Sequence, residues 1–277
     1  MRFTPISRAF PPPAFDFRNA QHRLRRSAGP HEPRGSRGPR RGWIPAHREV
    51  DCLGSRSSRR RCRHRVSGRR AGRTADDDSI ERLGRRAFAV RADLTRVAEC
   101  RRIVETAVRK LGRIDILINN VGEWVVESVA SMDAGTWRRI VDSNLTATFL
   151  CSKYAVPHML RRGWGRIVNL GAAGAYRAHG SAQVSAFYAA KAGIVAFSKS
   201  LAREVGAYGI TVNVVAPSVI EDPELPLADA RRRKNKRLAI PRVGTGEDVA
   251  NAVLFLVSEE AEFVTGDVLG VAEGWLL

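Results

Sequence analysis

Residues 114–122 read IDILINNVG, a short apolar run that ends in two asparagines and a glycine. A run of this length, closed by turn-forming residues, is typical of a buried β-strand. Comparable runs end near Leu170 and Ala216, and segments of helical length separate them. The sequence around 114–122 therefore alternates strands with helices.

This alternation continues from Ser79 to the end of the chain. The pattern predicts strands at 86–92, 114–119, 166–170, 211–216 and 268–271, and helices at 99–111, 136–161, 186–205 and 247–257. Short strands with intervening helices favour right-handed βαβ units, which build an α/β domain around a doubly wound parallel sheet. Ligands of such sheets bind beyond the carboxyl ends of the strands. The predicted functional edge therefore carries Asp93, Asn120, Gly171 and Pro217.

The positive charge of the chain is concentrated at its start. Residues 1–75 hold 20 arginines, no lysine and four acidic residues, a net charge of +16, against +19 for the whole chain. Residues 76–277 are thus nearly neutral, which does not favour nucleic acid as a partner of this domain.

The composition of residues 1–75 is dominated by Arg, Pro and Gly, with hardly any apolar periodicity. Such a segment cannot bury enough apolar surface to offset the entropy of ordering it. We expect either a disordered segment or one translated from GC-rich DNA in the wrong frame. An arginine-rich arm for nucleic-acid phosphates and a transit peptide are further interpretations. The expected division of the chain is therefore 1–75 and 76–277.

The cysteines argue against a metal site. Cys52, Cys62, Cys100 and Cys151 form no CxxC pair, and no histidine stands at a spacing suited to a metal. No apolar run reaches the roughly 18 residues of a membrane span. We expect a cytoplasmic chain that has no membrane partner.

Several motifs occur in a fixed order along 76–277. They are LINNVG at 117–122, SNL at 143–145, GRIVNL at 165–170, YAAKAG at 188–193, VNVVAP at 212–217, RVGTGEDVA at 242–250 and FVTG at 263–266. Together they resemble the short-chain dehydrogenase/reductase family, and in particular its members similar to 3-oxoacyl-carrier-protein reductase. The resemblance implies a single Rossmann-like domain, NAD or NADP as cofactor, and a small carbonyl or alcohol substrate. It also implies a homo-oligomer, a dimer or tetramer paired through helices 136–161 and 186–205.

The resemblance implies a catalytic set of Asn144, Tyr188 and Lys191. In the family a tyrosine hydroxyl transfers a proton, a lysine lowers the pKa of that tyrosine, and a helical asparagine places a water. Asn144 and Lys191 match directly. The family places its tyrosine four residues before the lysine, where this chain has Phe187. Tyr188 is one residue closer, a rotation of about 100° around a helix, so either Tyr188 still acts or Phe187 occupies the tyrosine position.

The family's catalytic serine is also replaced. Ala172 stands at that position and offers no hydroxyl, while Ser181 and Ser185 follow in the next segment. They are alternatives for the missing hydroxyl, although surface serines are the simpler interpretation.

The resemblance assigns cofactor contacts to three segments. These contacts are Asp93 and Leu94, then Asn120, Val121 and Gly122, and finally Pro217, Ser218 and Ile220. The glycine-rich turn for the pyrophosphate is not recognisable. Residues 35–38, GSRG, come nearest to it, but Pro39 and Pro45 would break the helix that should follow. The fold is therefore expected to have its first βαβ unit missing or unrecognisable.

Other departures cluster near the carboxyl end. Ser218 stands where the family has a glycine after proline, and residues 271–274, VAEG, stand where a glycine pair is usual, so that Glu273 precedes a single glycine. Asp222 would place negative charge near cofactor phosphates, which is unfavourable. The basic run 231–237 is interpreted as a solvated helix face or as a site for an anionic carrier.

The sequence leaves three functional hypotheses. The first is an oxidoreductase that moves a hydride between NAD(P) and a carbonyl or alcohol, with impaired chemistry. The second is an inactive member of the family that acts through association. The third is a nucleic-acid binder that works through the arginine-rich tail.

We predict that the chain binds NAD(P) more weakly than family members with an intact glycine-rich turn, by orders of magnitude. Backbone N–H groups at a helix N-terminus normally hold the pyrophosphate, and no segment before Asp76 has the apolar run of a buried parallel strand. Calorimetric titration with NADH and NADPH measures the affinity. A dissociation constant in the low micromolar range would contradict the prediction.

Overall fold

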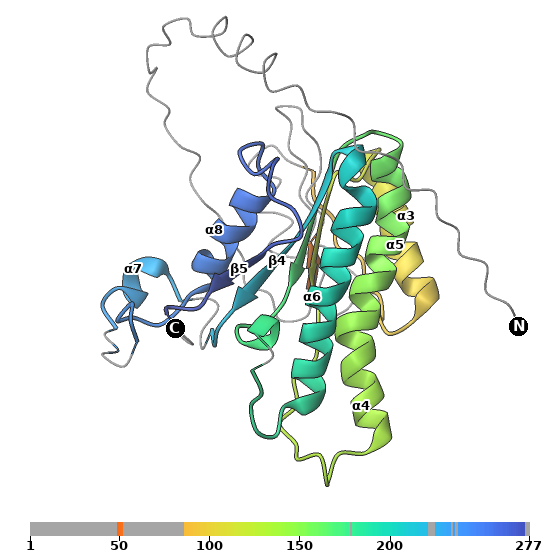
Figure 1. The fold of residues 1–277 in the computed structure, drawn as a ribbon. Helices are drawn as coiled ribbons and strands as arrows, with labels where there is room; N and C mark the ends of the chain where they lie inside the picture. Colours follow the sequence, from red (N-terminus) through yellow and green to blue (C-terminus); the bar gives the residue numbers. More distant parts are fainter. Residues whose placement is uncertain are drawn as a thin grey trace, which may run out of the picture. The chain divides into compact units, whose positions relative to one another are not determined.

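The computed structural model describes residues 49–51, 86–177, 179–220, 225–233, 235 and 238–274 (Figure 1). All of them belong to the unit Gly42–Leu277. The remainder of 1–75, which includes the 35–38 string and most of the proposed nucleic-acid arm, lies outside the described residues. Asp222 also lies outside them.

The described strands form one sheet in the order β1-β2-β3-β4-β5. Their bounds are Glu49–Asp51, Ile116–Asn120, Gly165–Leu170, Ile210–Pro217 and Val268–Val271. Strands β2 to β5 are parallel to one another, whereas β1 pairs antiparallel with β2. The parallel, helix-connected sheet confirms the predicted α/β architecture.

Helices cover both faces of the sheet (Figure 1). The helices are α3 at Val97–Leu111, α4 at Ala134–Val141, α5 at Ala147–Leu160, α6 at Ser185–Val205, α7 at Leu227–Ala230 and α8 at Gly246–Leu256. Leu117 and Ile167 pack in the core that also holds residues of α3, α5 and α6, while their neighbours Ile118 and Val168 pack with residues of α8. Adjacent strand residues face opposite sides of a sheet. The two cores are therefore separate layers, as a doubly wound fold requires.

The prediction of a strand at 86–92 is wrong, because these residues form no strand in the structure. Ala92 and Leu94 are nonetheless buried in the core beside α3. A strand must share backbone hydrogen bonds with a neighbour, and the free edge of β2 is taken by β1. Of residues 86–92 only Ala92 is buried, while Val90 packs partly buried against the same core, so the apolar pattern reflects these contacts rather than sheet pairing.

The helix predicted at 136–161 is divided in the structure. A π-helical turn, η1 at Asp142–Thr146, separates α4 from α5. Such turns contain one extra residue per turn and often occur at functional sites. Asn144 lies in the middle of this turn.

A chain of buried side-chain hydrogen bonds connects the sheet to two helices. Asn119 Nδ2 in β2 donates to Asn169 Oδ1 in β3 at 2.8 Å and to Ser152 Oγ in α5 at 3.1 Å. Asn169 Nδ2 in turn donates to Ser198 Oγ in α6 at 2.8 Å. Both asparagines are nearly inaccessible to solvent. The network therefore fixes α5 and α6 against paired positions of β2 and β3.

We predict that Asn169→Ala lowers the free energy of unfolding by about 2 kcal/mol, because it leaves buried polar groups of Asn119 and Ser198 without their partner. Urea denaturation measures this change. Ser131→Ala, which removes only exposed hydrogen bonds, is the control and should stay within about 0.5 kcal/mol of the unaltered chain. Equal losses of unfolding free energy in the two variants would contradict the proposed contribution of the network to stability.

Candidate active site

Lys191 is a buried amine at the carboxyl end of the sheet. It lies in α6, and its Nζ donates to the carbonyl oxygen of Leu170, the last residue of β3, at 2.7 Å. Burial lowers the pKa of Lys191 from 10.5 to about 8, because a charged amine loses its hydration there. The sequence-predicted lysine therefore lies at the edge where ligands of such sheets bind.

The first turn of α6 shows which aromatic residue accompanies this lysine. Lys191 Nζ lies 5.4 Å from the ring centroid of Phe187, one helical turn earlier. The rings of Phe187 and Tyr188 meet edge to face, with centroids 6.0 Å apart. Tyr188 is partly buried, and this burial raises the pKa of its hydroxyl. The helix thus places a phenyl ring beside the lysine, with the tyrosine one residue further on.

The π-helical turn presents Asn144 to the loop that follows β2. Asn144 Nδ2 donates to the carbonyl oxygens of Ile140 and Glu123, each at 2.9 Å. Its Oδ1 is buried without a hydrogen-bond partner. A Cβ atom on Gly122 would lie 1.9 Å from that oxygen, so the loop can approach this closely only because residue 122 is glycine. The amide of Asn144 therefore links the loop, through Glu123, to α4, through Ile140.

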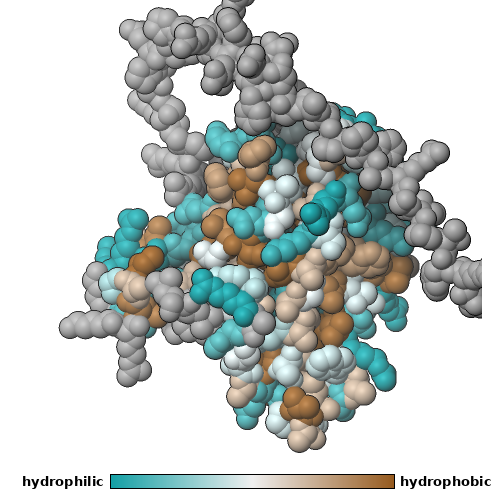
Figure 2. Space-filling model, viewed as in Figure 1, coloured by the Kyte–Doolittle hydropathy of each residue, from teal (hydrophilic) through white to brown (hydrophobic). Residues whose placement is uncertain are grey.

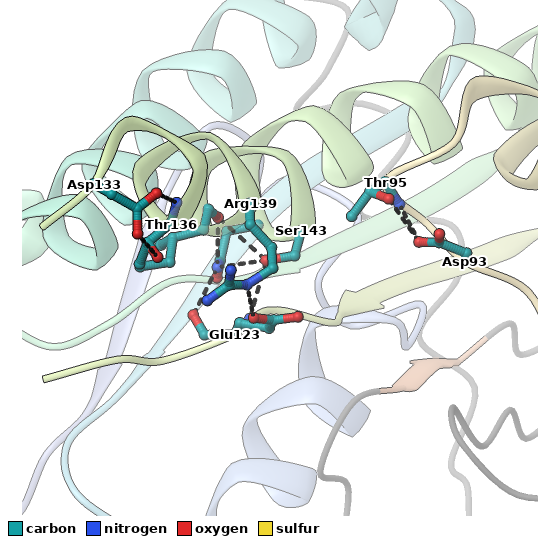
Figure 3. Close-up of polar contacts among 9 residues, drawn as sticks. Asp93, Thr95, Glu123, Asp133, Thr136, Arg139 and Ser143 are labelled. Atoms are coloured by element: carbon teal, nitrogen blue, oxygen red, sulfur yellow. Dashed lines mark hydrogen bonds and ion pairs between the residues drawn. The ribbon is translucent and has the colours of Figure 1, made fainter.

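Two further side chains hold the same loop (Figure 3). Ser143 Oγ accepts a hydrogen bond from Glu123 N at 3.2 Å, and Arg139 Nε lies 2.9 Å from Glu123 Oε2. Sequence reasoning did not select Glu123, Ser143 or Arg139. Their spacing next to Gly122 and Asn144 carries no chemical signature, and only the folded loop brings them together.

Asn144 and Lys191 come from packed neighbouring segments. Gly193 in α6 lies against Leu145 in η1, where an added Cβ would be 2.7 Å from Leu145 Cδ2. The close approach at Gly193 brings the π-helical turn and the lysine helix into direct contact.

The predicted adenosine contacts come from two segments, the turn before α3 and the end of β2. Asp93 Oδ1 accepts hydrogen bonds from Thr95 N at 3.1 Å and Thr95 Oγ1 at 2.7 Å, which shapes the turn before α3. Figure 3 shows this pair apart from the Glu123 cluster. Leu94 is buried in the core, so its side chain has a packing role. Asn120 ends β2, and Val121 and Gly122 follow it.

The ends of β3 and β4 are joined beyond their last residues. Gly171 N donates to Val215 O and Ala173 N donates to Pro217 O, both at 2.8 Å. Ala172 lies between these two bonds, where the family resemblance expects a serine. The alternatives differ in exposure: Ser181 is exposed, whereas Ser185 Oγ is buried without a hydrogen-bond partner.

Two features are absent from the part of the chain that the structure describes. It contains no cluster of His, Cys, Asp or Glu that could hold a metal ion. Within the same residues, no helix has both the length and the apolar character of a membrane span.

Comparison with known proteins places this arrangement in a family. The profile of a family described as Enoyl-(Acyl carrier protein) reductase matches residues 67–275. The 3-oxoacyl-[acyl-carrier-protein] reductase of Escherichia coli (strain K12) is 36% identical over 194 residues, which cover 69% of this chain and 79% of that protein. The oxidoreductase YtkK of Bacillus subtilis (strain 168) is 36% identical over 211 residues, covering 72% and 83%.

Solved structures agree with the sequence relatives. A 3-oxoacyl-reductase from Bacillus thuringiensis is 34% identical, with a TM-score of 0.69 over 77% of this chain and 87% of that chain. The fold and the ordered motifs thus define a nicotinamide-dependent oxidoreductase class. This chain belongs to the short-chain dehydrogenase/reductase family, whose members use NAD(P).

We predict that Lys191→Met raises the free energy of unfolding at pH 7. Because the folded pKa of about 8 lies below the unfolded value of 10.5, the folded chain holds fewer protons between these values, and its stability rises with pH across that window. Below pH 8 the buried charge destabilises the fold by about 3 kcal/mol relative to the neutral amine. The Lys191→Met variant should lack both the free-energy cost of the buried charge and the rise of stability between pH 8 and 10.5.

Urea denaturation at pH 7 and pH 9.5 measures the effect. Lys199→Met, which changes an exposed lysine of the same helix, is the matched control and should retain the rise. An unchanged pH dependence in Lys191→Met would show that Lys191 is not the titrating group.

Proposed function

We propose that this protein transfers a hydride between NAD(P) and a carbonyl or alcohol carbon, and that a 3-oxoacyl thioester is the first substrate to test. The observation that carries the proposal is the buried Lys191 amine at the carboxyl end of β3, in contact with the helix turn that presents Asn144. The relatives named as 3-oxoacyl-carrier-protein reductases support the substrate class.

The donor set fits the two ends of a dinucleotide cofactor. One N–H of Lys191 is bound to Leu170, and an ammonium group has three donors, so hydroxyl groups of a ribose suit the others. Asp93, Leu94, Asn120, Val121 and Gly122 would hold the adenosine end, and Pro217, Ser218 and Ile220 the nicotinamide end. The bound cofactor supplies the hydride. The string 35–38, which comes nearest to a pyrophosphate-binding turn, lies outside the described residues.

Tyr188 is the proton donor of this proposal. Its raised pKa keeps the hydroxyl protonated at neutral pH, which suits donation to a carbonyl oxygen. Lys191 orients the sugar and adds positive charge below pH 8. Asn144 acts through the loop at Glu123, because its side-chain N–H groups are already bound to the carbonyl oxygens of Glu123 and of Ile140 in α4.

A second candidate is a family member that keeps the fold for association. Phe187, rather than a tyrosine, lies beside Lys191, which favours this alternative. Phe149 and Leu160 of α5 are 42% and 37% exposed, as expected of helices that pair subunits. Under either candidate we propose a homo-oligomer built through α5 and α6.

We predict that Tyr188→Phe lowers kcat for acetoacetyl-coenzyme A by at least about 100-fold, since proton donation contributes about that much, and that Phe187→Tyr raises it. Oxidation of NADPH or NADH, followed by absorbance, measures the rate. Tyr208→Phe removes an exposed hydroxyl just beyond the end of α6 and serves as the control. Unchanged turnover in Tyr188→Phe would remove Tyr188 from the mechanism, and no turnover by any form would favour association.

A further inference from the structure

Two departures from the family's glycine pattern meet at the carboxyl ends of β4 and β5. Ser218 follows Pro217, the last residue of β4, and Glu273 lies two residues after Val271, the last residue of β5. The Ser218 hydroxyl donates to Glu273 Oε2 at 2.5 Å, and Ser218 N donates to Val271 O at 3.1 Å. The two substitutions therefore form one hydrogen-bonded unit.

The backbone of Glu273 is held in an unfavourable conformation. Its φ is 40°, in the left-handed region that a side chain with a Cβ rarely adopts. Such residues persist where the surroundings fix them, and they concentrate at functional sites. Here the carbonyl oxygen of Glu273 accepts a hydrogen bond from Ile240 N at 3.2 Å, which ties the residue to the segment before α8. Glu273 is thus held in place by hydrogen bonds of both its backbone and its carboxylate.

Arg242 attracts the Glu273 carboxylate through space, but its hydrogen bonds go to a different carboxylate. Arg242 forms a two-bond ion pair with Asp248, with both distances at 2.8 Å, so its charge is already compensated. Glu273 and Arg242 line a cavity of about 460 Å³. Arg177 borders the same cavity, but it is exposed to solvent, which screens its field. The Glu273 carboxylate is therefore a local negative charge that the Ser218 hydroxyl fixes at the carboxyl ends of β4 and β5.

We propose that Glu273 biases the bound cofactor toward its oxidised form and so favours hydride donation to a carbonyl substrate. The inference rests on the proposed function, in which Ser218 contacts the nicotinamide end. Hydride transfer breaks a C–H bond of the reduced ring and forms one at the carbonyl carbon. It leaves the ring positively charged, while Tyr188 gives a proton to the substrate oxygen. A carboxylate one hydrogen bond from Ser218 stabilises that positive charge through space.

The test compares affinities and does not depend on turnover. Dissociation constants are measured at low salt for NAD⁺, NADH and ADP-ribose, and for NADP⁺ and NADPH, with the full chain and with Glu273→Gln. This substitution keeps the size of the side chain and removes its charge. We expect the preference for the oxidised form to fall by at least about threefold, while the affinity for ADP-ribose, which has no nicotinamide, stays the same.

Controls separate charge from structure. Glu262→Gln removes an equal charge from an exposed residue that precedes β5, whereas Glu273 follows it, and should leave the preference unchanged. Ser218→Ala frees the carboxylate from its fixed position and should reduce the preference in part. Added salt should weaken the preference of the unaltered chain.

The outcomes separate a failure of the Glu273 inference from a failure of the proposed function. If all ligands bind and Glu273→Gln keeps the same preference, the inference is overturned and the proposed function stands. If neither ADP-ribose nor any of the dinucleotides binds, the proposed function fails and the inference fails with it.

Discussion

The hydrogen bond between the buried amides of Asn119 and Asn169 is the interaction on which the rest of the domain depends. These residues are paired positions of β2 and β3, and their side chains extend to Ser152 in α5 and Ser198 in α6. A register shift of one residue between these strands would put the two amides on opposite faces of the sheet. The network therefore fixes strand register and helix position together, and it places Lys191 at the end of β3.

Local pattern was sufficient for most elements of this domain. The apolar runs predicted β2, β3, β4 and β5, and helical spacing predicted α3, α6 and α8 within a few residues. The strand at 86–92 failed because pairing depends on which edge is free, and a distant segment, β1, took that edge. Ser218 and Glu273 were each recognised as unusual, but 55 residues separate them, and no local rule connects them.

In the candidate site too, the motifs revealed single residues, whereas the contacts between distant residues could be seen only in the folded structure. The sequence selected Asn144 and Lys191 as candidates through their motifs, and both lie at the predicted edge of the sheet, while their catalytic roles are part of the proposal. It did not indicate that the amide of Asn144 is bound to the loop at Glu123, because that bond depends on the π-helical turn. Nor did it decide between Phe187 and Tyr188. The helix now shows Phe187 beside the lysine, while the proton-donating role of Tyr188 remains a proposal.

The π-helical turn at Asp142–Thr146 has a consequence for the evolution of the domain. Such a turn contains one residue more than the α-helical turn it replaces, and regular helix flanks it on both sides. Deletion of a single codon here would let α4 and α5 fuse into one uninterrupted helix. A lineage released from selection for chemistry thus has a short route to a regular helix, and the same insertion in a regular helix is a short route by which the Asn144 loop contact can arise.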